Sequence, residues 1–285
     1  MVRLKVRHAI GGQSFELENV DTSLSIAELK RIVYQHCKVP PSCQKLLVES
    51  TILDDSETLA SHCPAECVFL SVSVVCVVDG VLKDLESDVS SKATKRRALE
   101  ALQSLRRRGD DCVIAAVCDF LEGMGADTVS DKMCGLRALN AVAERGNERA
   151  VVLLCAHLEA SDWLVRRAAV VALGEVARNA DEQVILVLCA RLKDSNPDVR
   201  CVAVEALSAI ADTGNKSVIA ALCTCSDDCD WCVRLTTVEA FRTIAGNDDE
   251  RAMNAILACL GDDDARVRRA AAETLRCLKH SLRDS

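Results

Sequence analysis

The chain has 285 residues, of which 49% are hydrophobic and only 2% aromatic, and its formal net charge is −8 at pH 7. The hydrophobic content is sufficient for two cores, and the acidic balance argues against general binding to nucleic acid. The longest apolar run is too short to cross a bilayer, and Arg3, Lys5 and Arg7 interrupt any secretory signal. We therefore expect no nucleic-acid or membrane partner and a cytoplasmic or nuclear location.

The N-terminal part, residues 1–79, has the pattern of a small α+β domain. Alternating apolar residues on both sides of a Gly-Gly-Gln loop predict a β-hairpin. A helix with a 3.6-residue apolar period should follow, capped by Ser23 or Ser25. Two strand-like stretches come after it, at 44–48 and 68–78. A hairpin, a helix and further strands on so few residues indicate one α+β unit.

Two motifs in this part resemble ubiquitin. Residues 39–47 read Val-Pro-Pro-Ser-Cys-Gln-Lys-Leu-Leu, and residues 53–59 read Leu-Asp-Asp-Ser-Glu-Thr-Leu, as in ubiquitin-like β-grasp domains. The resemblance implies a β-grasp fold and, as partners, ubiquitin-binding or proteasomal proteins. It also implies that ubiquitin's apolar binding patch corresponds to Leu47, to Ala9 or Ile10, and to Ser71. The alternative for Leu47 is a single exposed aliphatic residue without a function.

Beyond a linker expected at residues 80–90, the chain repeats itself. Equivalent apolar residues lie 34 positions apart, at Leu139, Leu173, Leu207, Phe241 and Leu275. A fixed period of this length predicts stacked helical units, because one unit cannot bury its apolar face without a neighbour. We therefore predict an all-α solenoid over residues 91–285, with about five and a half repeats and two antiparallel helices in each full repeat.

Each predicted unit has recognisable helix boundaries. Short polar residues that can cap the first helix occur at Asp162, Asn196, Asp230 and Asp264. Glycines mark the turn to the second helix at Gly109, Gly146 and Gly214. Three units also carry the motif Asp-x4-Val-Arg, followed by Ala-x2-Ala/Thr-Leu. This resembles the HEAT repeat in the short form of phycobilisome-lyase-like proteins.

The arginines of this motif have two interpretations. Arg166, Arg200, Arg234 and Arg268 could form a basic stripe for an acidic ligand. Alternatively, each could pair with its own aspartate six residues earlier and with the loop of the next unit. The constant six-residue spacing favours the structural alternative. Ala160 departs from the motif and leaves Arg166 without the equivalent acid.

The surface lined by the second helices is the candidate partner-binding face of the solenoid, because its residues vary from unit to unit. Its candidate residues are Arg149, Val152, Gln183, Leu186, Ser217, Ala220, Arg251 and Asn254. A second candidate is a weak metal site formed by Cys225, Cys229 and Cys232, which lacks a fourth ligand. We expect no cofactor.

No Ser/His/Asp cluster, phosphate loop or paired-carboxylate motif stands out, which favours a non-catalytic function over an enzyme. The sequence therefore predicts an interaction adaptor: the solenoid binds a client protein and the ubiquitin-like domain links it to the ubiquitin system. One alternative is a bilin-lyase-like or chaperone-like HEAT protein that acts on a chromophore protein. Another is a metal-binding protein that uses the cysteine cluster.

Overall fold

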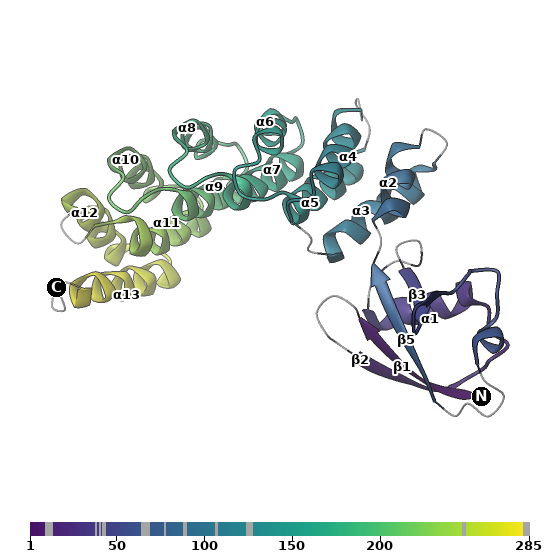
Figure 1. Cartoon of the computed structure of the whole chain (residues 1–285). Helices are drawn as coiled ribbons and strands as arrows, with labels where there is room; N and C mark the ends of the chain where they lie inside the picture. The colour runs from purple at the N-terminus through teal and green to yellow at the C-terminus, as the bar shows by residue number, and fades with distance from the viewer. Residues whose placement is uncertain are drawn as a thin grey trace. The chain divides into compact units, whose positions relative to one another are not determined.

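The computed structural model describes residues 1–8, 14–37, 39, 41, 44–63, 69–76, 78–87, 90–105, 108–123, 128–246 and 249–281. The chain divides into two compact units, residues 1–120 and 121–285 (Figure 1). The first contains a sheet and the second consists of helices. None of the helices in the described ranges is long and apolar enough to cross a membrane.

The sheet of the first unit has the strand order β2-β1-β5-β3-β4. Its strands are β1 (Val2–His8), β2 (Ser14–Val20), β3 (Gln44–Val48), β4 (Thr51–Ile52) and β5 (Phe69–Cys76). β1 pairs antiparallel with β2 and parallel with β5, and β3 pairs antiparallel with both β4 and β5. The predicted hairpin and the strand at 44–48 are thus confirmed, and this sheet with one helix is the β-grasp arrangement.

Helix α1 (Ile26–Cys37) and the sheet share one core. Ile26 and Leu29 of α1 are fully buried with Leu4 of β1. The cap predicted at Ser23 or Ser25 is formed by Ser25. Its Oγ accepts a hydrogen bond from the Glu28 backbone N–H at 3.3 Å, and the Glu28 carboxylate accepts from the Ser25 N–H at 3.0 Å. This reciprocal capping box satisfies two backbone donors at the helix start.

Three further helices follow the sheet within the first unit or at its end: α2 (Asp79–Glu86), α3 (Lys92–Leu105) and α4 (Asp111–Glu122). The linker predicted at residues 80–90 is therefore wrong for its first part. Val81 and Leu85, four residues apart, form a buried apolar face on α2, and α2 packs against α3. Charged residues lie between these apolar ones in the sequence, which makes the short helix difficult to recognise there.

The second unit is built from alternating first and second helices. The first helices are α5 (Val129–Val142), α7 (Trp163–Val176), α9 (Pro197–Ile210), α11 (Trp231–Ile244) and α13 (Ala265–Ser281). The second helices are α6 (Glu148–His157), α8 (Glu182–Arg191), α10 (Lys216–Cys225) and α12 (Glu250–Ala258), the last followed by the short η3 (Cys259–Gly261). Figure 1 shows the two sets as two rows. Within the first set, each helix packs against the next.

The repeat positions coincide with equivalent places in the structure. Leu173 of α7 and Leu207 of α9 are both fully buried, as the 34-residue period requires. The predicted caps are also present: Asp162, Asn196 and Asp230 each accept a hydrogen bond from a backbone N–H of the helix that follows. These confirmed features define the unit as a helical solenoid.

The turn inside each unit connects it to the next one. Gly146 and Gly214 adopt positive φ angles of 85° and 82°, and Ala180 at the equivalent position has φ 56°. The N–H of each turn residue donates to the last carbonyl of the next unit's first helix, for Ala180 to Ile210 at 2.7 Å. The turn glycines were predicted from the sequence. Their link to the neighbouring unit is seen only in the structure.

Candidate protein-interaction surface

The second helices place the predicted partner-binding residues on one surface, which we call the second-helix face. Its members are Arg149 and Val152 on α6, Gln183 and Leu186 on α8, Ser217 and Ala220 on α10, and Arg251 and Asn254 on α12. All are exposed except Ala220, which is half-buried. They share this orientation because each second helix turns Val184, Leu188 or their equivalents inward.

Two aliphatic residues dominate the first half of this face. Val152 is 70% exposed and Leu186 is 66% exposed, and they occupy the same position in neighbouring repeats. Ala220 and Asn254 continue the column, so the face changes from apolar to polar along the solenoid. Large aliphatic side chains that are exposed to solvent at repeating positions are a common feature of protein-binding surfaces.

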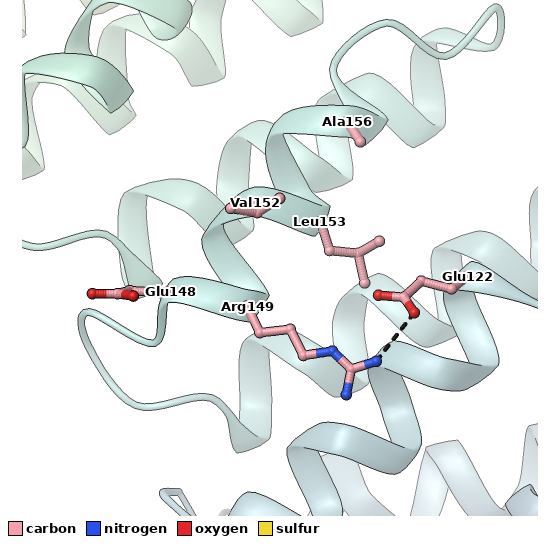
Figure 2. Close-up of a pocket in the computed structure, with 6 residues that line it drawn as sticks. All are labelled: Glu122, Glu148, Arg149, Val152, Leu153 and Ala156. Atoms are coloured by element: carbon pink, nitrogen blue, oxygen red, sulfur yellow. Dashed lines mark hydrogen bonds and ion pairs between the residues drawn. The ribbon is translucent and has the colours of Figure 1, made fainter.

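A pocket of about 310 Å³ opens beside Val152 on α6. Its apolar lining includes Val152, Leu153 and Ala156 of α6. Figure 2 shows Arg149 and Glu122 pointing toward one another at its edge, where Nη2 and Oε2 lie 3.1 Å apart. The pocket thus combines an aliphatic floor with a paired cation and anion.

The repeated arginines bind carboxylates of the next unit. Arg166 donates Nε and Nη2 to the two carboxylate oxygens of Asp194, both at 2.7 Å. The same bidentate contact joins Arg200 to Asp228, at 2.8 and 2.7 Å. A third such pair, Arg234 with Asp262, lies at 2.7 and 2.8 Å.

The structural interpretation of the arginine column is therefore confirmed, but the predicted partner is corrected. The aspartate of the arginine's own unit supplies only its backbone carbonyl, to which Nη1 donates, as in Arg200 to Asp194 at 2.8 Å. The backbone carbonyl of Ala160 serves Arg166 equally well, at 2.9 Å. Arg166 therefore loses no contact through the presence of Ala160, because the carboxylate that binds Arg166 belongs to Asp194 in the following loop.

These pairs change the protonation equilibria of both partners. Burial raises the pKa of Asp194 and Asp228, but hydrogen bonds from Arg166 and Arg200 and from backbone N–H groups more than offset it, and each pKa lies below its usual value. For Asp262, the hydrogen bond from Arg234 is the main cause of a lowered pKa. The carboxylates stay charged well into the acidic range.

The cysteines proposed as weak metal ligands are not brought together. Cys225 is buried, and its Sγ contacts the Ala221 carbonyl at 3.7 Å. Cys229 is exposed and lies beside Asp228. Across the described parts of the chain, no group of three or more His, Cys, Asp or Glu side chains could hold a metal ion. Among the residues that the structure describes, Cys225, Cys229 and Cys232 therefore do not form such a group.

Burial makes Cys225, and also Cys201 on α9, poor nucleophiles. It raises the pKa of Cys225 to about 11 and that of Cys201 to about 12. Neither thiol forms an appreciable amount of thiolate at neutral pH. Both behave as small core residues.

Two of the three residues predicted for the ubiquitin-like patch, Leu47 and Ser71, lie within the described residues, and the patch stays a prediction. Leu47 on β3 is half-buried and lies opposite Ile52 of β4 and Ser73 of β5. Ser71 is exposed, pairs with Lys5 of β1, and lies two residues from Ser73 on β5. Ile10 lies outside the described residues. The β3–β4 register places Ile52, which is 56% exposed, opposite Leu47.

Sequence reasoning missed two other exposed aliphatic residues. Leu257 on α12 and Leu260 in η3 are 50% and 39% exposed. Leu257 occupies the column of the half-buried Cys155, so the period alone indicated packing. Trp231 at the start of α11 is covered by the guanidinium of Arg266, 3.2 Å from the ring centre. This contact crosses to the next unit and leaves the ring less available as an interface anchor.

Family models match an N-terminal part and a C-terminal part of the chain. The model for the ubiquitin family matches residues 2–68. Two models for HEAT repeats match residues 153–242 and 252–281. These matches are to HEAT repeats in general, and the phycobilisome-lyase-like form stays a prediction. No curated protein matches the chain.

Three solved structures are similar to parts of the chain. An engineered protein aligns with a TM-score of 0.50 and 20% identity, covering 71% of this chain and 96% of its own. A designed armadillo repeat protein aligns with a TM-score of 0.49 and 18% identity, covering 70% and 98%. The UBL domain of Plasmodium falciparum Dsk2 covers 26% of this chain and 97% of its own, with 20% identity and a TM-score of 0.23. The chain thus joins an N-terminal ubiquitin-like domain to HEAT repeats in its C-terminal region.

Proposed function

We propose that this protein is a non-catalytic interaction scaffold with two binding surfaces. The second-helix face binds a client protein, and the ubiquitin-like domain links that client to ubiquitin-binding or proteasomal proteins. The main supporting observation is the exposure of Val152 and Leu186, at 70% and 66%, in matching positions of adjacent repeats. Exposed aliphatic side chains of this kind lose contact with water when a partner covers them.

The composition of the second-helix face also supports a specific client. The column that begins with Arg149 continues as Gln183, Ser217 and Arg251. A different polar group in each unit gives each repeat a different hydrogen-bonding capacity. A partner that spans several units would then be selected by the order of these groups as well as by the apolar contacts.

Affinity capture with the full-length chain tests both surfaces. One variant replaces Val152 and Leu186 with Arg, and a second replaces Leu47 with Arg. The control replaces Val171 with Arg, since this residue is 38% exposed on α7, in the other row of helices. Quantitative mass spectrometry of the captured proteins is the readout.

We expect the Val152 and Leu186 variant to lose one set of proteins and the Leu47 variant to lose a different set that contains ubiquitin-binding or proteasomal proteins. The Val171 variant should retain both. Identical sets from all variants would refute the two-surface scaffold. The bilin-lyase-like or chaperone-like alternative requires a chromophore protein in the set lost with Val152 and Leu186.

A further inference from the structure

Among the residues that the structure describes, one arginine of the repeated column has no carboxylate partner. Arg268 on α13 donates Nη1 to the backbone carbonyls of Asp262 and Asp263, at 2.6 and 3.0 Å, as its equivalents do in their own units. In the described part of the chain, however, no side chain accepts from its Nε and Nη2. In Arg166, Arg200 and Arg234 these two donors hold a carboxylate, whereas the fork of Arg268 is open to solvent.

The surface around this fork is basic. On α9, the positions Arg200, Cys201 and Val204 are buried. Their equivalents on α13 are Arg268, Arg269 and Ala272, and all three are exposed, as is Arg276. Arg268, Ala272 and Arg276 follow one another at intervals of four residues and so lie on one side of the helix. We call Arg268, Arg269, Ala272 and Arg276 the α13 arginine face.

The three occupied forks define the ligand that fits the open one. In each pair, the oxygen that accepts from Nη2 also accepts a backbone N–H two residues further along the chain. For Asp194 this donor is Asn196, for Asp228 it is Asp230, and for Asp262 it is Asp264, at 2.8 to 2.9 Å. The carboxylate is thus presented by an Asp-x-Asn or Asp-x-Asp turn at the start of a helix.

We propose that the α13 arginine face is a docking surface for an acidic segment of a partner protein. An aspartate of that segment, in an Asp-x-Asx turn, places its carboxylate in the fork formed by Nε and Nη2 of Arg268. Arg269 and Arg276 add positive charge on the same side of α13. Ala272 between them is small and permits close approach of the partner backbone.

A carboxylate suits this surface better than the phosphates of a nucleic acid. Asp263 and Glu273 are exposed close to the face along the chain and would repel an extended polyanion. The adjoining helix α11 has two aromatic residues: Trp231 is stacked by Arg266 and Phe241 is fully buried, so neither offers a free ring to a base. A single carboxylate is not an extended polyanion and requires no aromatic ring, because it binds only to Nε and Nη2 of Arg268.

The test is a titration of the full-length, ¹⁵N-labelled chain with a synthetic peptide that copies residues 192–198, Leu-Lys-Asp-Ser-Asn-Pro-Asp. The arginine Nε–H signals are followed by NMR. The signal of Arg268, assigned from its loss in Arg268→Lys, should shift saturably with a dissociation constant on the order of 1 mM. A peptide with Asn in place of Asp194 should bind about tenfold more weakly, since it cannot form the charged bidentate contact.

Protein variants separate the fork from general charge. Arg268→Lys keeps the charge but removes the fork and should weaken peptide binding about tenfold. The double variant Arg269→Gln and Arg276→Gln should weaken peptide binding about threefold, because these residues act through screened charge. Arg137→Gln, an exposed arginine on α5, should leave binding unchanged. Far-UV circular dichroism verifies that each variant is folded.

Four outcomes would overturn the proposal. The first is an Arg268 signal that does not move at any soluble peptide concentration, and the second is Arg268→Lys binding as tightly as the unmodified chain. Equal saturation by inorganic phosphate would show a general anion site. Tighter binding of a single-stranded oligonucleotide than of the peptide, lost in Arg268→Lys, would assign the face to nucleic acid instead.

Discussion

Arg166 and Asp194, which are 28 residues apart in the chain, form a bidentate ion pair that connects one repeat to the next. The side chains are only 12% and 4% exposed. Because the same pair recurs between later units, the solenoid contains a row of largely buried charges along its inter-unit loops. A buried pair of this kind contributes little net stability, but the loss of one partner is costly, since it leaves the other charge uncompensated.

Replacement of Asp228 by Asn should lower the free energy of unfolding by about 3 kcal/mol. The reason is that Arg200, whose side chain is 10% exposed, would remain charged without its counter-ion. Urea unfolding followed by circular dichroism measures the change. The control is Arg3→Gln, since Arg3 and Glu18 pair at 3.4 Å with both side chains more than half exposed, and it should cost less than about 0.5 kcal/mol. Equal losses in the two variants would contradict the argument.

Acidification should destabilise the repeats through the same carboxylates. The pKa values of Asp194, Asp228 and Asp262 are all lowered in the folded state. Because their pKa values are lowered by folding, these carboxylates take up protons more readily in the unfolded chain, where the pKa is about 4. Their contribution to stability is therefore complete near neutral pH and decreases progressively as the pH falls below about 5. Urea midpoints between neutral and acidic pH measure this. In Asp228→Asn the decline should be shallower, and an unchanged slope would contradict the assignment.

Ala180→Gly should stabilise the second unit by about 1 kcal/mol, because Ala180 holds a left-handed backbone that disfavours a Cβ atom. Gly214→Ala is the matched control. A Cβ on Gly214 would meet no atom within 4 Å, so its cost should come from the positive φ alone and be of similar size and opposite sign. Thermal or urea unfolding of both variants provides the comparison. A destabilising Ala180→Gly would show that the turn is not strained.

Thr237→Val should leave stability unchanged or raise it by about 1 kcal/mol. Thr237 is fully buried, and its hydroxyl has no hydrogen-bond partner among the described residues, while Ala169 and Ala203 stand at the equivalent positions of other units. Thr274→Val is the contrasting variant. The Thr274 hydroxyl donates to the Val238 carbonyl at 3.3 Å, so its removal should destabilise by about 1 kcal/mol. The opposite order in unfolding experiments would contradict this account.

Local patterns predicted most of the elements correctly. The caps at Ser25 and Asn196 and the turn at Gly214 depend on a few adjacent residues, so their chemistry is visible in the chain itself. The helix α2 was missed because its apolar face consists of little more than Val81 and Leu85. Such a short pattern is hidden among acidic residues and becomes a helix through packing against α3.

The candidate surfaces were predictable only in part. The 34-residue period placed Val152 and Leu186 on one face, because identical spacing gives identical orientation. It could not show that Ile52 lies opposite Leu47, since pairing between strands depends on register. The period also did not reveal which aspartate binds each arginine.

The sequence by itself determined the two folds and the repeat length, because apolar periodicity and capping residues act over a few positions. Only the tertiary structure decided that Arg166 binds Asp194, that the Cys225 thiol is buried against the Ala221 carbonyl, and that Arg268 has an open fork. These facts depend on how one repeat is rotated and displaced against its neighbour. That geometry results from the packing of many side chains at once, and no short segment encodes it.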